Sequence, residues 1–297
     1  MAGPGLCSTD RHVTVTGNFR LSQKSHQMSI NGQNTPPDAA RLRDLKTLPR
    51  PLYGHVESLP NRVLGYRHRH PWGQFAYAAQ GVLEVLSDAG RFVAPPQRAV
   101  WIPAGVMHRV VCSAQTQVRS LYVARQIPGW AADRCRVLAV SPLLRELIRA
   151  FSEVPEAYDE AGPDGRLAAV LFDQIAAAPE VALMLPLPVD PQLRALCARV
   201  QVHPERTLLL ADWAERAGVS EKTLSRRFVR ETGLSFRAWR QRMRLLGALP
   251  ALAQGERVTD VALACGYDSL SAFIAAFKAQ FNATPGEFQQ STPGLMP

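Results

Sequence analysis

The chain has 297 residues, of which 46% are hydrophobic and 20% are charged, so we expect about two globular domains and exclude a wholly disordered chain. The 34 Lys and Arg residues outnumber the 25 Asp and Glu residues, and the net charge of +9 favours a polyanionic partner. No apolar run reaches the ~18–20 residues that cross a bilayer, which argues against a membrane partner. The 5 cysteines lack CxxC spacing and the first residues form no apolar signal segment, so we expect a cytoplasmic protein.

The first part of the chain is predicted to be a tail followed by a β-rich domain. Residues 1–50 are rich in small polar residues and lack apolar periodicity, so we expect a disordered N-terminal tail, with Met28 as an alternative start. Residues 51–140 carry short aromatic and β-branched runs between Gly, Pro and Asp turns, which predicts an antiparallel sandwich or barrel. The predicted strands are Gly73–Tyr77, Val82–Leu86, Arg98–Ile102, His108–Cys112 and Val118–Val123.

The middle of the chain changes to a helical period. Helices are predicted over Pro142–Phe151 and Gly165–Ala178. The first of them carries an apolar stripe of Leu143, Leu144, Leu147, Ile148 and Phe151. We expect the helical segment 141–180 to make a homodimer contact, and burial of the stripe against the chain's own β domain is the alternative. The prolines between residues 178 and 191 then predict an extended linker.

Residues 190–290 are predicted to be all-helical and contain an internal repeat. Asp212-Trp-Ala-Glu-Arg-Ala-Gly218 and Asp260-Val-Ala-Leu-Ala-Cys-Gly266 share their Asp, Ala and Gly positions. In each copy the Gly suits a left-handed turn between two helices, and the Ser that follows suits the next N-cap. These caps are Ser220 and Ser269, with Gly233 and Asn282 as C-caps. The repeat predicts two helix-turn-helix units.

A helix over Arg237–Leu252 is expected to join the two units, and Pro250 is expected to kink or split it. The repeat resembles the AraC/XylS family of bacterial transcription regulators, most specifically over Ala262–Lys278 and Phe281-Asn-Ala-Thr-Pro285. Ser220–Phe228 is similar to the first recognition helix of that family. The sequence departs from the family at Asn282, where Gly is usual, and at Gln289, where a basic residue is common. The resemblance covers roughly the last third of the chain and implies double-stranded promoter DNA as a partner, with RNA polymerase added if the protein is an activator.

Basic residues are concentrated in the predicted first unit, where residues 222–244 contain a single acid, Glu231. If Leu224 and Phe228 face the core, the opposite face of this helix can enter a major groove. The candidate DNA-binding residues are Glu221, Lys222, Ser225, Arg226, Arg230 and Arg240, with Ser269, Ser271 and Lys278 in the second unit. Arg226 is the best candidate for bidentate contact with guanine, and a phosphate contact is the alternative.

The β-rich part contains a spaced set of ligand-type residues: His68 and His70, then Gln74, then His108 in Pro103-Ala-Gly-Val-Met-His108. Residues 68, 70 and 74 would share one face of a strand. The spacing resembles the two cupin motifs and implies a small jelly-roll barrel, although Gln74 replaces the usual Glu and Cys112 the usual Asn. Three interpretations stay open for His68, His70, Gln74 and His108: an effector pocket, a divalent-metal site, or barrel packing. Further candidates for the pocket or for the core are Trp72, Tyr77 and Trp101.

The fold class expected from these patterns is an α+β multidomain chain, with a cupin-like jelly-roll barrel and an all-α domain of two helix-turn-helix units. The leading hypothesis is a sequence-specific transcriptional regulator, not an enzyme, which responds to a small-molecule effector through the barrel. One alternative is a cupin metalloenzyme, such as a dioxygenase, with a helical appendage. A third is a constitutive DNA-binding protein whose barrel only dimerises.

Overall fold

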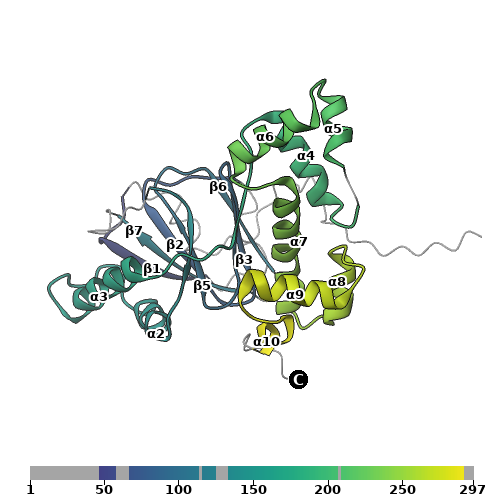
Figure 1. Ribbon diagram of the computed structural model, residues 1–297. Helices are drawn as coiled ribbons and strands as arrows, with labels where there is room; N and C mark the ends of the chain where they lie inside the picture. Colours follow the sequence, from purple (N-terminus) through teal and green to yellow (C-terminus); the bar gives the residue numbers. More distant parts are fainter. Residues whose placement is uncertain (1–46, 58–66, 114–115, 125–132, 207–208, 291–297) are drawn as a thin grey trace, which may run out of the picture.

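The computed structural model describes residues 47–57, 67–113, 116–124, 133–206 and 209–290. Most of the predicted tail, including Met28, lies outside these residues. A β-rich N-terminal part is followed by a helical C-terminal part, in the order that the sequence predicts (Figure 1). Within the described ranges, no helix combines the length and apolar character that crossing a membrane would require.

The β-rich part consists of two antiparallel sheets. The strands are β1 (Leu52–Glu57), β2 (Gly73–Gln80), β3 (Leu83–Ser87), β4 (Gly90–Ala94), β5 (Arg98–Ile102), β6 (His108–Cys112), β7 (Gln117–Val123), β8 (Arg136–Ala139) and β9 (Met184–Pro186). Their order is β1-β7-β2-β5-β8 in one sheet and β6-β3-β4-β9 in the other. Among the described strands, each ladder stays within its own sheet, so the pairing does not close into one continuous barrel.

The two sheets pack against each other through their inner faces. Ala76 and Ala78 of β2 join the main core with Val85 of β3, whereas Phe75 and Tyr77 join a second cluster on the outer face. Side chains alternate along a strand, so the even-numbered residues of β2 face the opposite sheet. This alternation directs Gln74, which is only 6% exposed, toward the interior.

Two helices, α2 (Pro142–Phe151) and α3 (Pro163–Ala177), pack on the outer cluster of the five-stranded sheet. The predicted apolar stripe is therefore largely buried within its own chain, through Leu144, Ile148 and Phe151. Burial of each side chain of this size contributes about 1.5–3 kcal/mol. Leu143, the first member of the stripe, is 55% exposed.

The segment predicted as a linker belongs to the fold instead. Glu180 forms a bridge with Leu138 of β8 in the five-stranded sheet, and β9 pairs with β4 in the four-stranded sheet, so this segment pairs with both sheets in turn. The sequence prediction missed this strand because its prolines suggested a free connection. Leu183 and Leu185 nevertheless bury their side chains in the main core, which fixes the segment in place.

The helical part contains α4 (Pro191–Val202), α5 (Leu210–Arg216), α6 (Glu221–Thr232), α7 (Phe236–Ala253), α8 (Val258–Ala264), α9 (Leu270–Phe281) and α10 (Pro285–Gln290). The expected split at Pro250 does not occur, because α7 is one helix that includes this residue. Leu249 and Leu252, on either side of the proline, are 1% exposed in the main core, and their packing holds the helix together.

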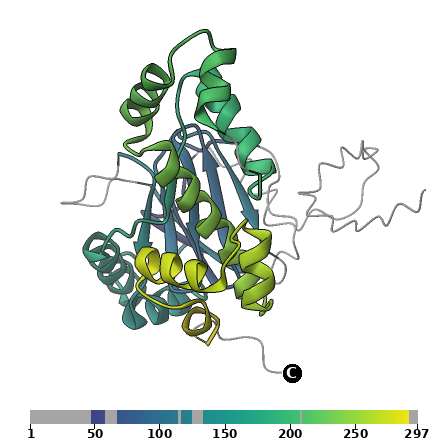
Figure 2. The ribbon, with the colours of Figure 1, turned by 45° about the vertical axis from the view of Figure 1, so that its right-hand side comes forward.

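The helical part packs on the four-stranded sheet through α7, with α4–α6 near one end of this helix and α8–α10 near the other (Figure 2). The indole Nε1 of Trp239 in α7 donates to the carbonyl of Pro186 in β9 at 2.6 Å. Oε2 of Glu231 accepts the backbone N–H groups of Val189 and Asp190 at 2.8 and 2.9 Å. Glu231, the single acid among residues 222–244, therefore connects α6 to Val189 and Asp190, which follow β9.

Candidate functional site

Two helix pairs, α5–α6 and α8–α9, share the same turn chemistry. Gly218 and Gly266 have φ angles of +63° and +76°, the left-handed region that favours glycine. Oγ of Ser220 accepts the N–H of Thr223 at 3.2 Å, and Oγ of Ser269 accepts the N–H of Ala272 at 3.4 Å. α6 and α9 then end at Gly233 and Asn282, which are both left-handed. The caps predicted from the repeat are confirmed, and they give the two pairs matching local geometry.

The outward face of α6 is positively charged. Leu224 and Phe228 are 3% and 0% exposed, so they anchor the helix on the core. Lys222, Arg226 and Arg230 lie on the exposed side, and within the described part of the chain no carboxylate forms an ion pair with them. Two further predicted DNA contacts lie on the same helix, the exposed Glu221 and the half-buried Ser225.

The second helix pair presents a plainer surface. Ser269, Ser271 and Lys278 of α9 are exposed, and the hydroxyl oxygens of the two serines are 2.8 Å apart. Phe273 and Phe277 are fully buried beneath them. α9 therefore offers hydroxyl groups and one exposed cation, whereas α6 offers three exposed cations and the half-buried Arg227.

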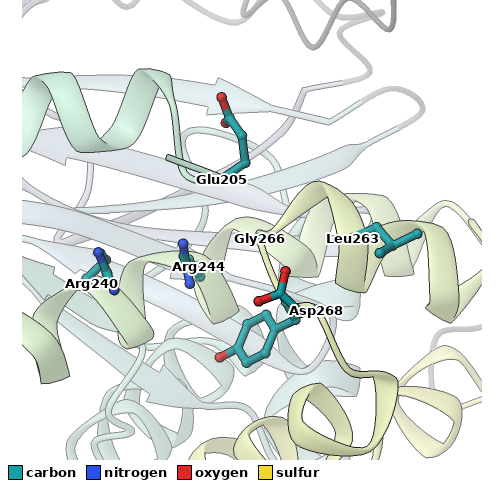
Figure 3. A pocket seen from close by; sticks show the side chains of 7 residues that line it. Glu205, Arg240, Arg244, Leu263, Gly266 and Asp268 are labelled. Atoms are coloured by element: carbon teal, nitrogen blue, oxygen red, sulfur yellow. The ribbon is translucent and has the colours of Figure 1, made fainter. Parts of the chain in front are cut away.

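Arg240 differs from the other predicted DNA contacts because it lies in a recess between α7 and the α8–α9 turn (Figure 3). Burial, and then the nearby charges of Arg244 and Arg237, lower the pKa of Arg240. Nε of Arg244 donates to the carbonyl of Pro204 at 2.8 Å. The recess is lined by Glu205, Arg240, Arg244, Leu263, Gly266, Tyr267 and Asp268, so it holds charges of both signs.

The spaced histidines converge between the two sheets. β2 begins at Gly73, so His68 and His70 precede the strand instead of sharing its face. His68 and His108 exchange two backbone hydrogen bonds of 2.9 Å, which place the segment before β2 beside the start of β6. The carbonyl of His70 accepts the N–H of Gly105 at 2.8 Å. Backbone pairing, and not strand alternation alone, therefore brings the histidines together.

The donor atoms of His68, His70 and His108 all lie within 4.8 Å of one another. The ring centroids of His68 and His70 are 4.3 and 5.1 Å from that of His108. Oε1 of Gln74 is 3.1 Å from Nε2 of His70, and Nε2 of Gln74 donates to Oγ of Ser120 at 3.1 Å. The four predicted residues therefore form one group, which we call the histidine cluster.

Burial makes the cluster favour neutral imidazoles. His108 is fully buried, and this desolvation lowers its pKa to about 4. Burial also lowers the pKa of His70, although hydrogen bonds to Gln74 and to the carbonyl of Trp72 oppose the shift. Neutral imidazoles can donate or accept hydrogen bonds and can ligate metals.

The aromatic residues around the cluster differ in part from those suggested by the sequence. Trp72 stacks on His70 with the ring planes 8° apart, and Tyr122 meets His70 edge-on at 6.0 Å. Tyr77 and Trp101 instead belong to the outer cluster beneath α2 and α3. Sequence reasoning missed Tyr122 and Ser120, because the register of β7 against β2 places them and no local pattern in the sequence specifies it.

Two family models match the chain: an AraC-like ligand binding domain over residues 51–172 and a helix-turn-helix domain over residues 213–291. The HTH-type transcriptional regulator NimR of Escherichia coli K12 is 36% identical over 221 residues, which cover 74% of this chain and 81% of NimR. The regulator RipA of Corynebacterium glutamicum is 31% identical over 42% of this chain and 40% of its own length. A crystal structure of ToxT from Vibrio cholerae O395 aligns over 82% of this chain and 99% of ToxT, with 12% identity and a TM-score of 0.36. The chain therefore belongs to the AraC-type family of transcriptional regulators, with a ligand-binding domain followed by a helix-turn-helix domain.

Proposed function

We propose that this regulator binds duplex promoter DNA through α6 and α9, each acting as the recognition helix of one helix-turn-helix unit. The observation that carries this proposal is the exposed face of α6, where Lys222, Arg226 and Arg230 have no acidic partner among the described residues. DNA phosphates would supply the missing negative charge.

Within this proposal, α6 provides most of the sequence discrimination. Arg226 makes the bidentate contact with a guanine, because it is exposed on a helix whose opposite face is anchored in the core. Arg240 and Lys278 contact phosphates. The remaining proposed contacts are Glu221, Ser225, Arg230, Ser269 and Ser271.

The test is binding of the full chain to labelled duplexes from its own upstream region, measured by fluorescence anisotropy at several salt concentrations. Arg226→Ala should weaken binding and change the preference at one base position. Arg166→Ala removes an exposed positive charge from α3, which lies across the sheets from α6 (Figure 1), and should leave binding unchanged. Equal effects of the two substitutions would contradict the assignment.

We further propose that the β-rich part is a cupin-like jelly roll whose histidine cluster lines the effector site. Two buried polar atoms support this assignment, since Nε1 of Trp72 and Nε2 of His108 have no hydrogen-bond partner among the described residues. Nε1 of Trp72 is a hydrogen-bond donor, and Nε2 of His108 belongs to an imidazole that can accept a hydrogen bond. A small polar molecule with both kinds of group would satisfy them.

The effector proposal is tested with a promoter reporter in cells and DNA binding in vitro. His70→Ala and His108→Gln should abolish the response to inducing conditions while leaving DNA affinity within a few-fold of the parent. His203→Ala, which changes a histidine at the C-cap of α4, serves as the control. A normal response in both cluster variants would show that these histidines only support the fold.

A homodimer through residues 141–178 remains part of the proposal. Leu143 of α2 and Val170 of α3 support it, because they are 55% and 43% exposed. Sedimentation of the full chain and of Leu143→Glu tests this contact, and a strict monomer at micromolar concentration would contradict it.

If the regulator raises transcription, RNA polymerase is a further partner. The relatives are named as regulators, so we propose no enzymatic activity.

A further inference from the structure

We propose that the recess between α7 and the α8–α9 turn binds a small phosphate monoester with free hydroxyl groups, such as a sugar phosphate, and that Arg240 and Arg244 hold its phosphate. This site is separate from the histidine cluster. It shares Arg240 with the proposed DNA contacts, and only its expected effect on DNA binding rests on the proposed function.

Two guanidinium groups lie together in the recess without a counterion. Arg240 and Arg244 are four residues apart on α7, so they lie on the same face of the helix (Figure 3). Burial, and then the charge of Arg244, lowers the pKa of Arg240. Over the described ranges, Arg240 forms no hydrogen bond or ion pair, and neither Nη atom of Arg244 has an acceptor. An anion held by both groups would replace their repulsion with charge-assisted hydrogen bonds.

The fold fixes Arg244 in an orientation that suits a ligand. Its Nε donates to the carbonyl of Pro204 at 2.8 Å, and its Cζ lies 6.0 Å from the centre of the Tyr267 ring. These contacts leave the Nη atoms for an anion, and a guanidinium held in place loses little freedom when it binds one. A Cβ on Gly266 would lie 2.8 Å from Nη2 of Arg244, so the glycine keeps the space beside the guanidinium open.

The other charged residues of the recess are acidic. Asp268 is exposed and forms no ion pair within the part of the chain that the structure describes. Oε1 of Glu205 lies 3.7 Å from Nε of Arg206. A DNA strand has a phosphate at every nucleotide, and its flanking phosphates would be repelled by these carboxylates. A small ester brings a single phosphate, and its hydroxyl groups can donate to a carboxylate. The charge pattern therefore favours a small ester.

The size of the recess also suits such a ligand. Its volume is about 310 Å³, at the lower end of the range that small-molecule sites occupy. Leu263 and Tyr267 give it apolar surface on which a sugar ring can pack. The arginines, the carboxylates and the apolar side chains together match the three parts of a sugar phosphate.

The test is calorimetric titration of the full chain, without DNA, with ribose 5-phosphate, inorganic phosphate and ribose. The parent should bind a single ribose 5-phosphate per chain, more tightly than inorganic phosphate, and should not bind ribose. Arg240→Gln should weaken binding of both phosphates by about tenfold or more, because it removes a charge-assisted contact. Arg242→Gln is the matched control, because it removes the same charge from α7 at a residue that does not line the recess.

Asp268→Ala tests the hydroxyl contacts at an exposed position, where folding should not be disturbed. The lost charge favours both phosphates alike, so the ratio of their affinities reports the hydroxyl groups alone. We expect the preference for ribose 5-phosphate over inorganic phosphate to shrink. No binding of ribose 5-phosphate by the parent, unchanged binding by Arg240→Gln, or an unchanged preference in Asp268→Ala would each overturn the proposal.

Anisotropy with a labelled upstream duplex separates this site from the proposed function. Ribose 5-phosphate should weaken DNA binding by the parent, because it occupies Arg240, and should have no effect on Arg240→Gln. If Arg240→Gln weakens DNA binding but the parent binds no ester, the recess serves the DNA backbone and the ester site is wrong. If the ester binds without changing DNA affinity, the ester site is supported and the proposed contact of Arg240 with DNA is wrong.

Discussion

The β-rich and the helical parts of this regulator place their functional groups in opposite environments. His108 and Gln74 are 0% and 6% exposed between the two sheets, where each depends on partners supplied by the fold. Lys222 and Arg226 instead lie on the solvent side of α6, and only the helix backbone positions them. A substitution of a packed group should therefore change stability, whereas a substitution of an exposed group should change only binding.

Gly218 and Gly266, in the turns of the two helix pairs, test this difference between packed and exposed groups within the helical part. Their substitution gives the largest change in the free energy of unfolding that we expect. Both are left-handed, which costs about 1–2 kcal/mol for a residue with a side chain. A Cβ on Gly266 would also lie 2.8 Å from Arg244 and 2.9 Å from the backbone of Glu205, whereas a Cβ on Gly218 has no neighbour within 4 Å. We expect Gly266→Ala to lower the free energy of unfolding by about 3 kcal/mol, because the clash adds to the backbone cost.

Urea denaturation of both variants, followed by circular dichroism, checks this prediction. Gly218→Ala should cost only the backbone term, about 1–2 kcal/mol. If the two variants lose the same free energy of unfolding, the turn at Gly266 relaxes freely around a new side chain. Packing at this turn would then have no effect on stability beyond the backbone cost.

Arg226→Ala tests the exposed side of the comparison. We expect the substitution to remove about 1–3 kcal/mol of binding free energy that depends on the base at one position of the site. The free energy of unfolding should change by less than about 0.5 kcal/mol. Lys278→Ala, on the exposed face of α9, should weaken binding similarly for all sequences, because a phosphate contact carries no base information. Anisotropy titrations against a set of single-base variants of the site measure both effects. An unchanged base preference in Arg226→Ala would make this residue a phosphate contact.

The same difference explains which features the sequence could predict. Helical periodicity and cap chemistry are local, so the exposed face of α6 and the caps at Ser220 and Ser269 followed from the sequence. The residues of the histidine cluster were also found, because their spacing is a local motif. Their partners were not, since Ser120 and Tyr122 reach the cluster through the long-range register of β7. β9 was missed because its prolines obscured a strand that forms only against β4.

Acid should affect the packed cluster before the exposed helix face. The pKa of His108 is about 4 in the folded chain and near 6.5 when unfolded, so below about pH 6.5 the unfolded chain binds a proton that the folded chain does not. Stability therefore falls as the pH falls, by about 2 kcal/mol between about pH 7 and about pH 5 from this residue.

The measurement compares urea denaturation of the chelated parent with that of His108→Gln at both pH values. Other groups titrate in both proteins, so the difference between the two pH dependences isolates His108. If the variant loses as much stability as the parent, the pKa of His108 is not lowered in the folded chain, and burial does not disfavour its charged form.

The smallest expected effect concerns the two N-caps, where an exposed hydroxyl has a role in stability as well as a proposed role at DNA. Ser220→Ala and Ser269→Ala should each cost about 1 kcal/mol of stability, because a backbone N–H loses its acceptor. Aspartate caps a helix as well as serine does, so Ser220→Asp and Ser269→Asp should keep the stability of the parent. The added negative charge should repel DNA phosphates, and both variants should bind DNA more weakly, with a loss that shrinks as salt screens the repulsion. Denaturation and anisotropy on the same samples separate the two roles. Parent-like DNA binding by Ser269→Asp would place the start of α9 away from the DNA, and would leave α6 as the single recognition helix of the proposal.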